Sequence, residues 1–534
     1  MPVIRSLMIP AILLLISASL PAQEIPHLKS DGKTIRLYVE GQPFIMVSGE
    51  LHNSSSSSLT YMEPIWPRLK GMGLNSVIAS ISWEQFEPEE GKFDYTLIDG
   101  LIADAFANKL KLGIIWFASW KNGVSSYLPL WVKKDSKRFF KLKDKNGSTS
   151  ETVSPFCREA RKSDAKAFAK LMKRIKSVDK NHTVIIVQPE NEVGAFQDMD
   201  YNTEALDLFK SEVPDALTKY LSKNEDHLSP EMQAVWTANG RKTKGTWTEL
   251  FGDTMKSAQN FMMSWQYATY VNEVVRMGKK EYDLPMYVNA WLVQKPTDLP
   301  GVYPNGGPVS RAIDIYKAAA PDIDICAPDI YLPNFREILG IYHRHDNPIF
   351  IPESTVDPAR AFYAFGEHDA IGFSPFGIED VWMNNQYIMA MNVINELMPL
   401  ILQNQGTGRM HGFMQTKNIK TDTLSFGETN IVIEYINRES NGYGLVIQTG
   451  PEEFLAAGMD VRLKFISVNP TARINIGQVF EGKFVDGKWI TYRMLNGDET
   501  MHNERLVMTG RQSELKTEKV NGPGLYKVFT YDMK

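Results

Sequence analysis

The sequence predicts an α/β fold, a (β/α)8 TIM barrel followed by a smaller C-terminal all-β sandwich domain. Short apolar segments alternate eight times with stretches of helical periodicity up to about residue 405. Polar and aromatic residues gather directly after these segments, as they do at the carboxyl ends of barrel strands. From about residue 406 the pattern changes to short strands separated by turn residues, which is typical of a sandwich.

The barrel prediction begins with a hairpin at residues 33–43 and continues with eight strands. The clearest strand is the β-branched run Val184 to Val187, which cannot face water on either side and therefore indicates a parallel strand covered on both faces. The predicted strands span residues 44–48, 76–81, 112–117, 184–187, 286–288, 323–327, 349–351 and 370–373. The main predicted helices span residues 62–72, 97–109, 163–177 and 381–403, with a helical insertion at about 203–279.

These patterns divide the chain into a signal peptide at residues 1–22, a barrel domain at 23–405 and a β-sandwich domain at 406–534. Strands of the sandwich are expected at residues 430–435, 443–448, 459–465, 472–476, 489–493, 505–508 and 525–531. We expect this last domain to pack against the barrel as a buttress rather than to bind carbohydrate like a lectin.

The first 23 residues have the pattern of a secretory signal. Arg5 provides the positive start, Leu7 to Ile16 the apolar run, and small residues lead to cleavage after Ala22. The apolar run is too short to span a membrane, and Pro10 argues against a buried helix. We therefore expect a secreted or periplasmic bacterial protein without a stable membrane span after cleavage.

Composition excludes several classes of function. Of 534 residues, 43% are hydrophobic and 23% charged, which suits a soluble protein with a large core. A net charge of −5 leaves no basic footprint for nucleic acid.

Cys157 and Cys326 allow one disulfide, but their barrel-like segments favour two free buried thiols. Metal-binding spacings and phosphate-binding glycine loops do not occur, so we expect no cofactor. Nothing in the sequence specifies an oligomeric state.

Two glutamates stand at the ends of apolar strands. Glu192 follows the strand at 184–187, and Glu353 follows the strand at 349–351. A barrel glycosidase needs two carboxyl groups in such positions, one as acid/base and one as nucleophile. Either glutamate alone is equally well explained as a helix cap or as a partner of an arginine. Glu190 competes with Glu192 for the acid/base role, since strand alternation does not separate them, but we expect Glu190 to be structural.

The other strand ends carry residues suited to a sugar-binding rim. Aromatic rings offer apolar faces, and amides and carboxylates bind hydroxyl groups. A single tryptophan is more often a packing residue, but a ring of such residues favours a carbohydrate site. The candidate substrate-binding residues are Glu50, His52, Trp83, Glu87, Trp116, Trp120, Asn122, Asn191, Asn289, Trp291 and Tyr331.

Several motifs resemble those of glycoside hydrolase family 35, the β-galactosidases of clan A. The segment Gln188-Pro189-Glu190-Asn191-Glu192-Val193-Gly194 is similar to the family's Gln-Val-Glu-Asn-Glu-Tyr-Gly signature. Gly41-Gln42-Pro43-Phe44, Ser48 to His52, Gly73 to Val77 and the block from Trp83 to Asp94 also resemble it, so the resemblance covers roughly residues 30–400. Together with Gly372 to Asp380 and the β-rich C-terminus, it points to a bacterial branch of the family.

The resemblance implies a retaining exo-β-galactosidase that removes terminal β-galactosyl residues from oligo- or polysaccharides by double displacement. It implies Glu192 as acid/base and Glu353 as nucleophile, with their carboxyl groups about 5.5 Å apart and Asn191 at the sugar 2-hydroxyl. Two positions depart from the family: Ser80 replaces a tyrosine, and Ala118 to Asn122 replaces a Cys-Ala-Glu-Trp element. The alternatives are therefore a glycosidase for another pyranose, such as a glucoside, mannoside or arabinopyranoside, and a non-catalytic carbohydrate-binding barrel.

Overall fold

The computed structural model describes residues 24–383, 385–417, 419–436, 442–510 and 522–533. The predicted signal peptide, Met1 to Ala22, lies outside the described residues. No helix in the described ranges is both long and apolar enough to cross a bilayer.

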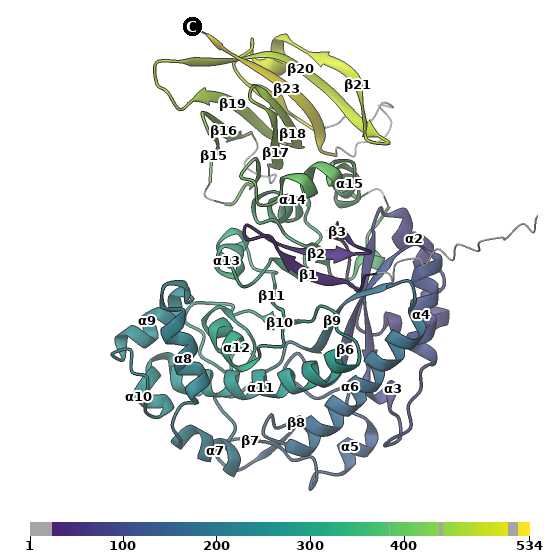
Figure 1. The fold of residues 1–534 in the computed structure, drawn as a ribbon, viewed down its shortest axis with the longest axis vertical. Coiled ribbons are helices and arrows are strands. Elements are labelled where there is room, and N and C mark those ends of the chain that lie inside the picture. Colours follow the sequence, from purple (N-terminus) through teal and green to yellow (C-terminus); the bar gives the residue numbers. More distant parts are fainter. Residues whose placement is uncertain (1–23, 384, 418, 437–441, 511–521, 534) are drawn as a thin grey trace, which may run out of the picture.

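Eight parallel strands form a closed barrel, which confirms the predicted (β/α)8 fold (Figure 1). Neighbouring strands pair directly or through single bridges at Glu50–Ile78, Val187–Met286 and Ile330–Ser354. In barrel order the strands are β4 (Met46–Val47), β5 (Ser76–Ser82), β6 (Lys111–Lys121), β9 (Val184–Asn191), β10 (Tyr287–Trp291), β11 (Ile325–Asp329), β12 (Phe350–Ser354) and β13 (Gly372–Pro375).

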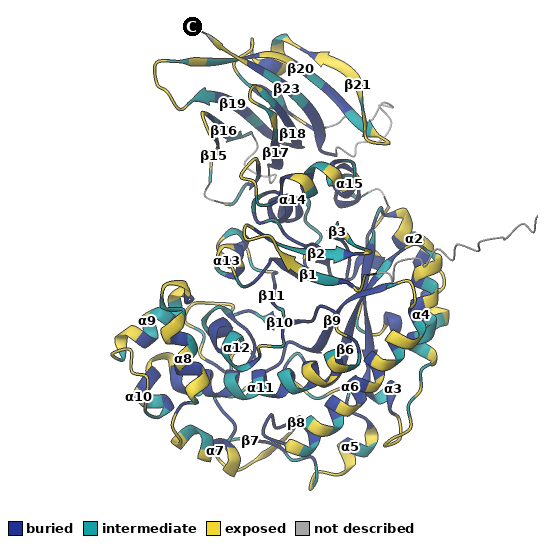
Figure 2. Ribbon diagram, viewed as in Figure 1, coloured by how far each residue is buried: buried dark blue, intermediate teal, exposed yellow. Residues whose placement is uncertain are grey.

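Helices connect the strands on the outside of the barrel. Their outer faces are exposed and their inner faces are buried against the strands (Figure 2). The main helices are α2 (Ile65–Gly71), α4 (Thr96–Ala107), α6 (Arg158–Val178), α11 (Ser257–Glu281), α12 (Ile313–Ala319), α13 (Phe335–Tyr342), α14 (Pro358–Glu367) and α15 (Gln386–Asn404). The last of these begins five residues later than the predicted helix at 381–403, because Val381 is extended and Asn385 caps the helix through its side chain.

The predicted insertion after β9 consists of helices, as expected. They are α7 (Thr203–Lys210), α8 (Asp215–Lys223), α9 (Pro230–Ala238) and α10 (Trp247–Phe251), followed by α11. In Figure 1 the first four lie at the periphery of the barrel, outside α11 and α12.

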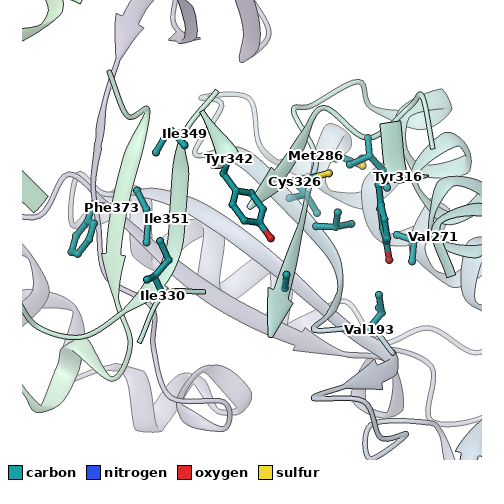
Figure 3. Close-up of a cluster of buried hydrophobic side chains, with 14 of the residues drawn as sticks. Val193, Val271, Met286, Tyr316, Cys326, Ile330, Tyr342, Ile349, Ile351 and Phe373 are labelled. Atoms are coloured by element: carbon teal, nitrogen blue, oxygen red, sulfur yellow. The ribbon is translucent and has the colours of Figure 1, made fainter. Parts of the chain in front are cut away.

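Apolar side chains fill the barrel in two layers. The inner layer is closed at the amino-terminal end of the strands by the hairpin β1 (His27–Ser30), β2 (Ile35–Val39) and β3 (Gln42–Phe44), whose Leu37 and Val39 pack on the strand interior. The outer layer lies between strands and helices, and Figure 3 shows part of it around Tyr342 and Cys326. Both Cys157 and Cys326 are buried free thiols, which confirms that prediction.

Two packed antiparallel sheets follow the barrel and form the expected sandwich. One sheet has the order β14-β17-β18-β23-β20-β21 and the other β15-β16-β19-β22. Their bounds are β14 (Met410–Met414), β15 (Thr421–Phe426), β16 (Thr429–Tyr435), β17 (Tyr443–Gly450), β18 (Glu453–Met459), β19 (Val461–Ser467), β20 (Arg473–Val485), β21 (Lys488–Leu495), β22 (Leu506–Met508) and β23 (Gly524–Met533). The sequence prediction missed β14, β15 and β18.

The six-stranded sheet is covered on both faces. One face packs on the four-stranded sheet around Phe454 and Val446. The other carries Tyr443, Leu445 and Leu455, which belong to the same buried cluster as the outer layer of the barrel. The ring of Tyr443 lies 5.1 Å from that of Phe362 on α14. Barrel and sandwich therefore share one continuous apolar core.

Candidate active site

Glu192 and Glu353 line the same cavity at the carboxyl ends of the strands. The cavity has a volume of about 240 Å³. Its lining residues are Asn122, Glu192, Trp291, Leu292, Gln294, Asp329, Tyr331, Leu332 and Glu353. Two carboxylates from opposite parts of the barrel thus meet at one opening.

The end of β9 has an unusual backbone that presents Glu192. Glu190 and Glu192 adopt positive φ angles of 66° and 43°, a left-handed conformation that costs a non-glycine residue of order 1–3 kcal/mol. Hydrogen bonds hold this conformation: the Glu192 N–H donates to Asn289 Oδ1 at 2.8 Å, and its carbonyl accepts from the Gly123 N–H at 3.1 Å. Asn289 therefore positions the glutamate.

A local irregularity of β12 presents Glu353. The pairing with β13 shifts register between Ile351 and Ser354, and such a shift redirects the side chains within it. One carboxylate oxygen of Glu353 accepts a hydrogen bond from the Tyr331 hydroxyl at 2.6 Å. The other oxygen is buried without a protein partner among the described residues, so it is free to meet a ligand.

The electrostatics of the cavity favour a protonated Glu192. Burial, and then the charge of Glu353, raise the pKa of Glu192 to about 7, although Lys121 and a hydrogen bond with Asp329 oppose the shift. Burial raises the pKa of Asp329 and Glu50 well above their usual values, and the charge of Glu353 adds to both shifts. A carboxyl group that holds its proton near neutral pH is suited to general acid catalysis.

Glu190 points away from this cavity. Its two carboxylate oxygens accept hydrogen bonds from the backbone N–H groups of Ser119, at 3.2 Å, and Trp120, at 2.7 Å. The residue is 1% exposed, and burial followed by the charge of Asp164 raises its pKa well above the usual value. Glu190 thus joins the ends of β6 and β9, which supports the expectation that it is structural.

Four other residues predicted for substrate binding lie in or against the cavity. Asn122, Trp291 and Tyr331 line it directly. Asn289 lies behind them and donates from Nδ2 to Asp329 at 2.6 Å while it holds Glu192. Asn191 is not one of the lining residues. It is buried, and both polar atoms of its side chain have no protein partner among the described residues.

The prediction that Trp83, Glu87, Trp116 and Trp120 bind substrate is wrong. All three rings are completely buried, so they have no surface to offer a ligand. The Trp83 indole donates to Glu87 Oε2 at 2.8 Å, which occupies both members of that pair. The indoles of Trp116 and Trp120 face the outer helices and donate to Asp164 and to the Val153 carbonyl.

Glu50 and His52 also lie outside the lining. Glu50 is buried behind the cavity and interacts with it through charge. His52 is half exposed, and its Nε2 lies 2.9 Å from Asp380. Its backbone N–H donates to Glu379. The structure therefore places His52 in a loop contact with Glu379 and Asp380.

Sequence reasoning missed the roles of Asp329 and Lys121. Asp329 follows an apolar strand, as the two glutamates do, so its position carried the same signal. Lys121 lies 5.3 Å from the ring centroid of Phe117. Phe117 belongs to the barrel interior, so this contact places Lys121 near the opening. Strand parity could not have shown this, because the pairing of β6 with β9 shifts register between Trp116 and Lys121.

Comparison with known proteins finds similarity in both parts of the chain. Residues 36–270 match the family model "Glycosyl hydrolases family 35", and residues 390–507 match a domain of unknown function, DUF5597. No curated protein matches the chain.

Similar solved structures include two β-galactosidases, from Bacillus circulans sp. alkalophilus and Rahnella sp. R3. Each is 14% identical with a TM-score of 0.45, and each alignment covers 67% of this chain and 57% of the other. The chain thus spans less than two thirds of these relatives. The catalytic domain of a β-amylase from Paenibacillus polymyxa aligns at 15% identity and a TM-score of 0.42, covering 61% of this chain and 91% of that domain. Residues 36–270 of the barrel therefore resemble glycoside hydrolases of family 35, and the barrel opening holds a pair of carboxylates.

Proposed function

We propose that the protein is a retaining exo-β-galactosidase that removes terminal β-galactosyl residues from oligo- or polysaccharides. The observation that carries the proposal is the cavity shared by Glu192 and Glu353 in a family 35 barrel. The cavity volume, about 240 Å³, is below the range of roughly 300–1,000 Å³ typical of larger ligands, which suits a single terminal sugar.

In this mechanism Glu353 attacks the anomeric carbon while Glu192 protonates the departing oxygen. A covalent glycosyl-enzyme forms, and Glu192 then takes a proton from the water that hydrolyses it. Tyr331 orients the nucleophile through its 2.6 Å hydrogen bond, and Asn289 orients the acid/base through the Glu192 backbone. Asn122 and Trp291 are placed to contact the sugar. The unpaired amide of Asn191 suits the sugar 2-hydroxyl.

Hydrolysis of a panel of 4-nitrophenyl glycosides tests this function. The β-galactoside is expected to give the highest kcat/KM, and NMR of the first product is expected to show the β-anomer. Ser80 and the segment Ala118 to Asn122 stand where the resembled family has sugar-contacting residues, and the Ser80 hydroxyl donates here to the Asn53 carbonyl. A β-glucoside, β-mannoside or α-L-arabinopyranoside as the best substrate would thus assign another sugar, and first release of the α-anomer would exclude retention.

The pH dependence of kcat/KM is expected to follow Glu192. Its pKa of about 7 means that the acid form predominates below pH 7 and disappears above it. Because leaving-group protonation needs this form, kcat/KM for an alkyl β-galactoside is expected to fall about tenfold for each pH unit well above 7. Initial rates between pH 5 and 9 measure this limb, and a flat profile across pH 7 to 9 would contradict the role of Glu192.

We also propose that the protein is exported across the inner membrane. The proposal rests on the signal pattern of residues 1–22 and is tested by N-terminal sequencing of the mature protein, which is expected to begin at Gln23.

A further inference from the structure

A second cavity adjoins the catalytic one, between the helical insertion and the segments that follow β10 and β11. Its volume is about 470 Å³, about twice that of the catalytic cavity. Helix α9 contributes Ala234 and Val235 to its wall, and α13 contributes Ile338 and Ile341. Within the described chain, no residue of the insertion lines the catalytic cavity, so the insertion forms a neighbouring space rather than a cover.

The two cavities meet at three residues. Leu292 and Gln294 after β10, and Leu332 after β11, line both. The Gln294 amide donates to the Leu292 carbonyl at 2.7 Å, which fixes the turn at this junction. A terminal sugar with its anomeric carbon between Glu192 and Glu353 leaves only the leaving group to extend outward. The second cavity is therefore in position to receive a leaving group.

Apolar side chains, most of them aliphatic, make up the larger share of the wall of the second cavity. Sugar subsites present aromatic faces for stacking, but among the described lining residues there is no tryptophan or phenylalanine. The two tyrosines, Tyr303 and Tyr342, are each 1% exposed and offer no open ring face. An apolar ring or chain fits such a wall better than a second sugar does.

Eight of the lining residues have polar or charged side chains, and most of these side chains are already hydrogen-bonded within the protein. Glu231 Oε1 accepts from Ser310, and Arg311 Nη2 donates to Ser257. Glu231 Oε2 and Arg311 Nε are buried without protein partners in the part of the chain that the structure describes. They offer one acceptor and one donor for an alcohol or phenol group. The charged lining side chains are two carboxylates, Glu231 and Asp298, and one guanidinium, so an anionic leaving group is disfavoured.

We propose that the second cavity is a leaving-group site that selects glycosides of uncharged, largely apolar, ring-containing alcohols or phenols. This inference rests on the proposed β-galactosidase function and adds the chemistry of the aglycone to it. It also assigns the helical insertion a role in specificity, because α9 supplies part of the wall.

Two alkyl β-galactosides with leaving groups of similar basicity test the proposal. The full chain is expected to hydrolyse 4-phenylbutyl β-galactoside with a kcat/KM at least about tenfold above that of ethyl β-galactoside, since a few buried methylene groups supply such a factor. Equal values for the two, or a preference for a disaccharide such as lactose over 4-phenylbutyl β-galactoside, would overturn it.

A pair of matched variants locates the effect. Ala234 and Ala238 are both exposed on α9, one turn apart, but only Ala234 lines the cavity. Ala234→Trp is expected to lower kcat/KM for the phenylbutyl glycoside about tenfold and to leave the ethyl glycoside unchanged, while Ala238→Trp changes neither. Equal slowing of both glycosides by Ala234→Trp, or no effect on either, would contradict the assignment.

The outcomes separate this inference from the function on which it rests. Failure to hydrolyse any β-galactoside contradicts the proposed function. Hydrolysis without discrimination between the two alkyl groups contradicts only the leaving-group site. Binding of 4-phenylbutanol tests the cavity without any turnover. Ligand-observed NMR measures this binding to the wild-type chain and to Ala234→Trp. Loss of binding in the variant supports the site, and equal binding opposes it.

Discussion

Glu353→Ala is expected to reduce hydrolysis of 4-nitrophenyl β-galactoside by a factor on the order of 10⁴ or more, the effect of removing a covalent nucleophile in other enzymes. The variant keeps the cavity but has no group to attack the anomeric carbon. Glu84→Gln provides the control, because Glu84 is a carboxylate paired with Lys133 at 3.3 Å and does not line the cavity. Steady-state rates of the three proteins measure the effect, and comparable rates for Glu353→Ala and wild type would end the assignment.

Azide distinguishes loss of the nucleophile from general damage to the site. A small anion can occupy the space of the missing carboxylate in Glu353→Ala and attack the same face of the sugar. The expected product is α-galactosyl azide, with restored turnover of a substrate that carries an acidic leaving group. Formation of the β-azide by this variant would place the nucleophile elsewhere.

Glu192→Ala is expected to produce the second largest loss, and the loss should depend on the leaving group. General acid catalysis contributes about 10²–10⁴-fold, and only poor leaving groups need it. We expect a loss of this size for an alkyl β-galactoside and little loss of the first chemical step for 2,4-dinitrophenyl β-galactoside. Pre-steady-state kinetics with both substrates measure the contrast, with Glu84→Gln again as the control.

The same variant should respond to azide with the opposite stereochemistry. The intact Glu353 forms the glycosyl-enzyme, and azide then attacks the face from which Glu192 normally activates water. The expected product is β-galactosyl azide. An equal loss for both leaving groups, or an unchanged fall in activity above pH 7, would contradict the acid/base role of Glu192.

The sequence predicted the barrel and the two glutamates at its opening because both depend on strong local signals. A run of β-branched residues such as Val184 to Val187 can be stable only inside, and a glutamate directly after such a run lies at the carboxyl end of the barrel. The missed strand β18, Glu453–Met459, has two alanines and a glycine in seven residues, so its propensity is weak although its neighbours on both sides pair with it.

The errors in the site concern the direction of side chains. Trp116 and Trp120 lie on β6 with the parity of Ile114 and Ala118, which face the outer helices, whereas Phe117 faces the barrel interior. Alternation along the strand therefore separates Trp116 from Phe117, but it fails for Ser119, which bonds to Asp164 on α6, because the pairing of β6 with β9 is irregular there. For Glu353 parity would also have failed, because the register shift in β12 redirects its side chain, and no pattern in the sequence reports such a shift.

The continuous apolar core has a consequence for how the protein unfolds. Here Leu445 and Leu455 of the sandwich complete the covering of α14, and Arg336 on α13 pairs with Asp422 on β15 at 2.8 Å. A chain cut after residue 405 would expose that apolar surface to water. We therefore expect the barrel and the sandwich to unfold together as one cooperative unit.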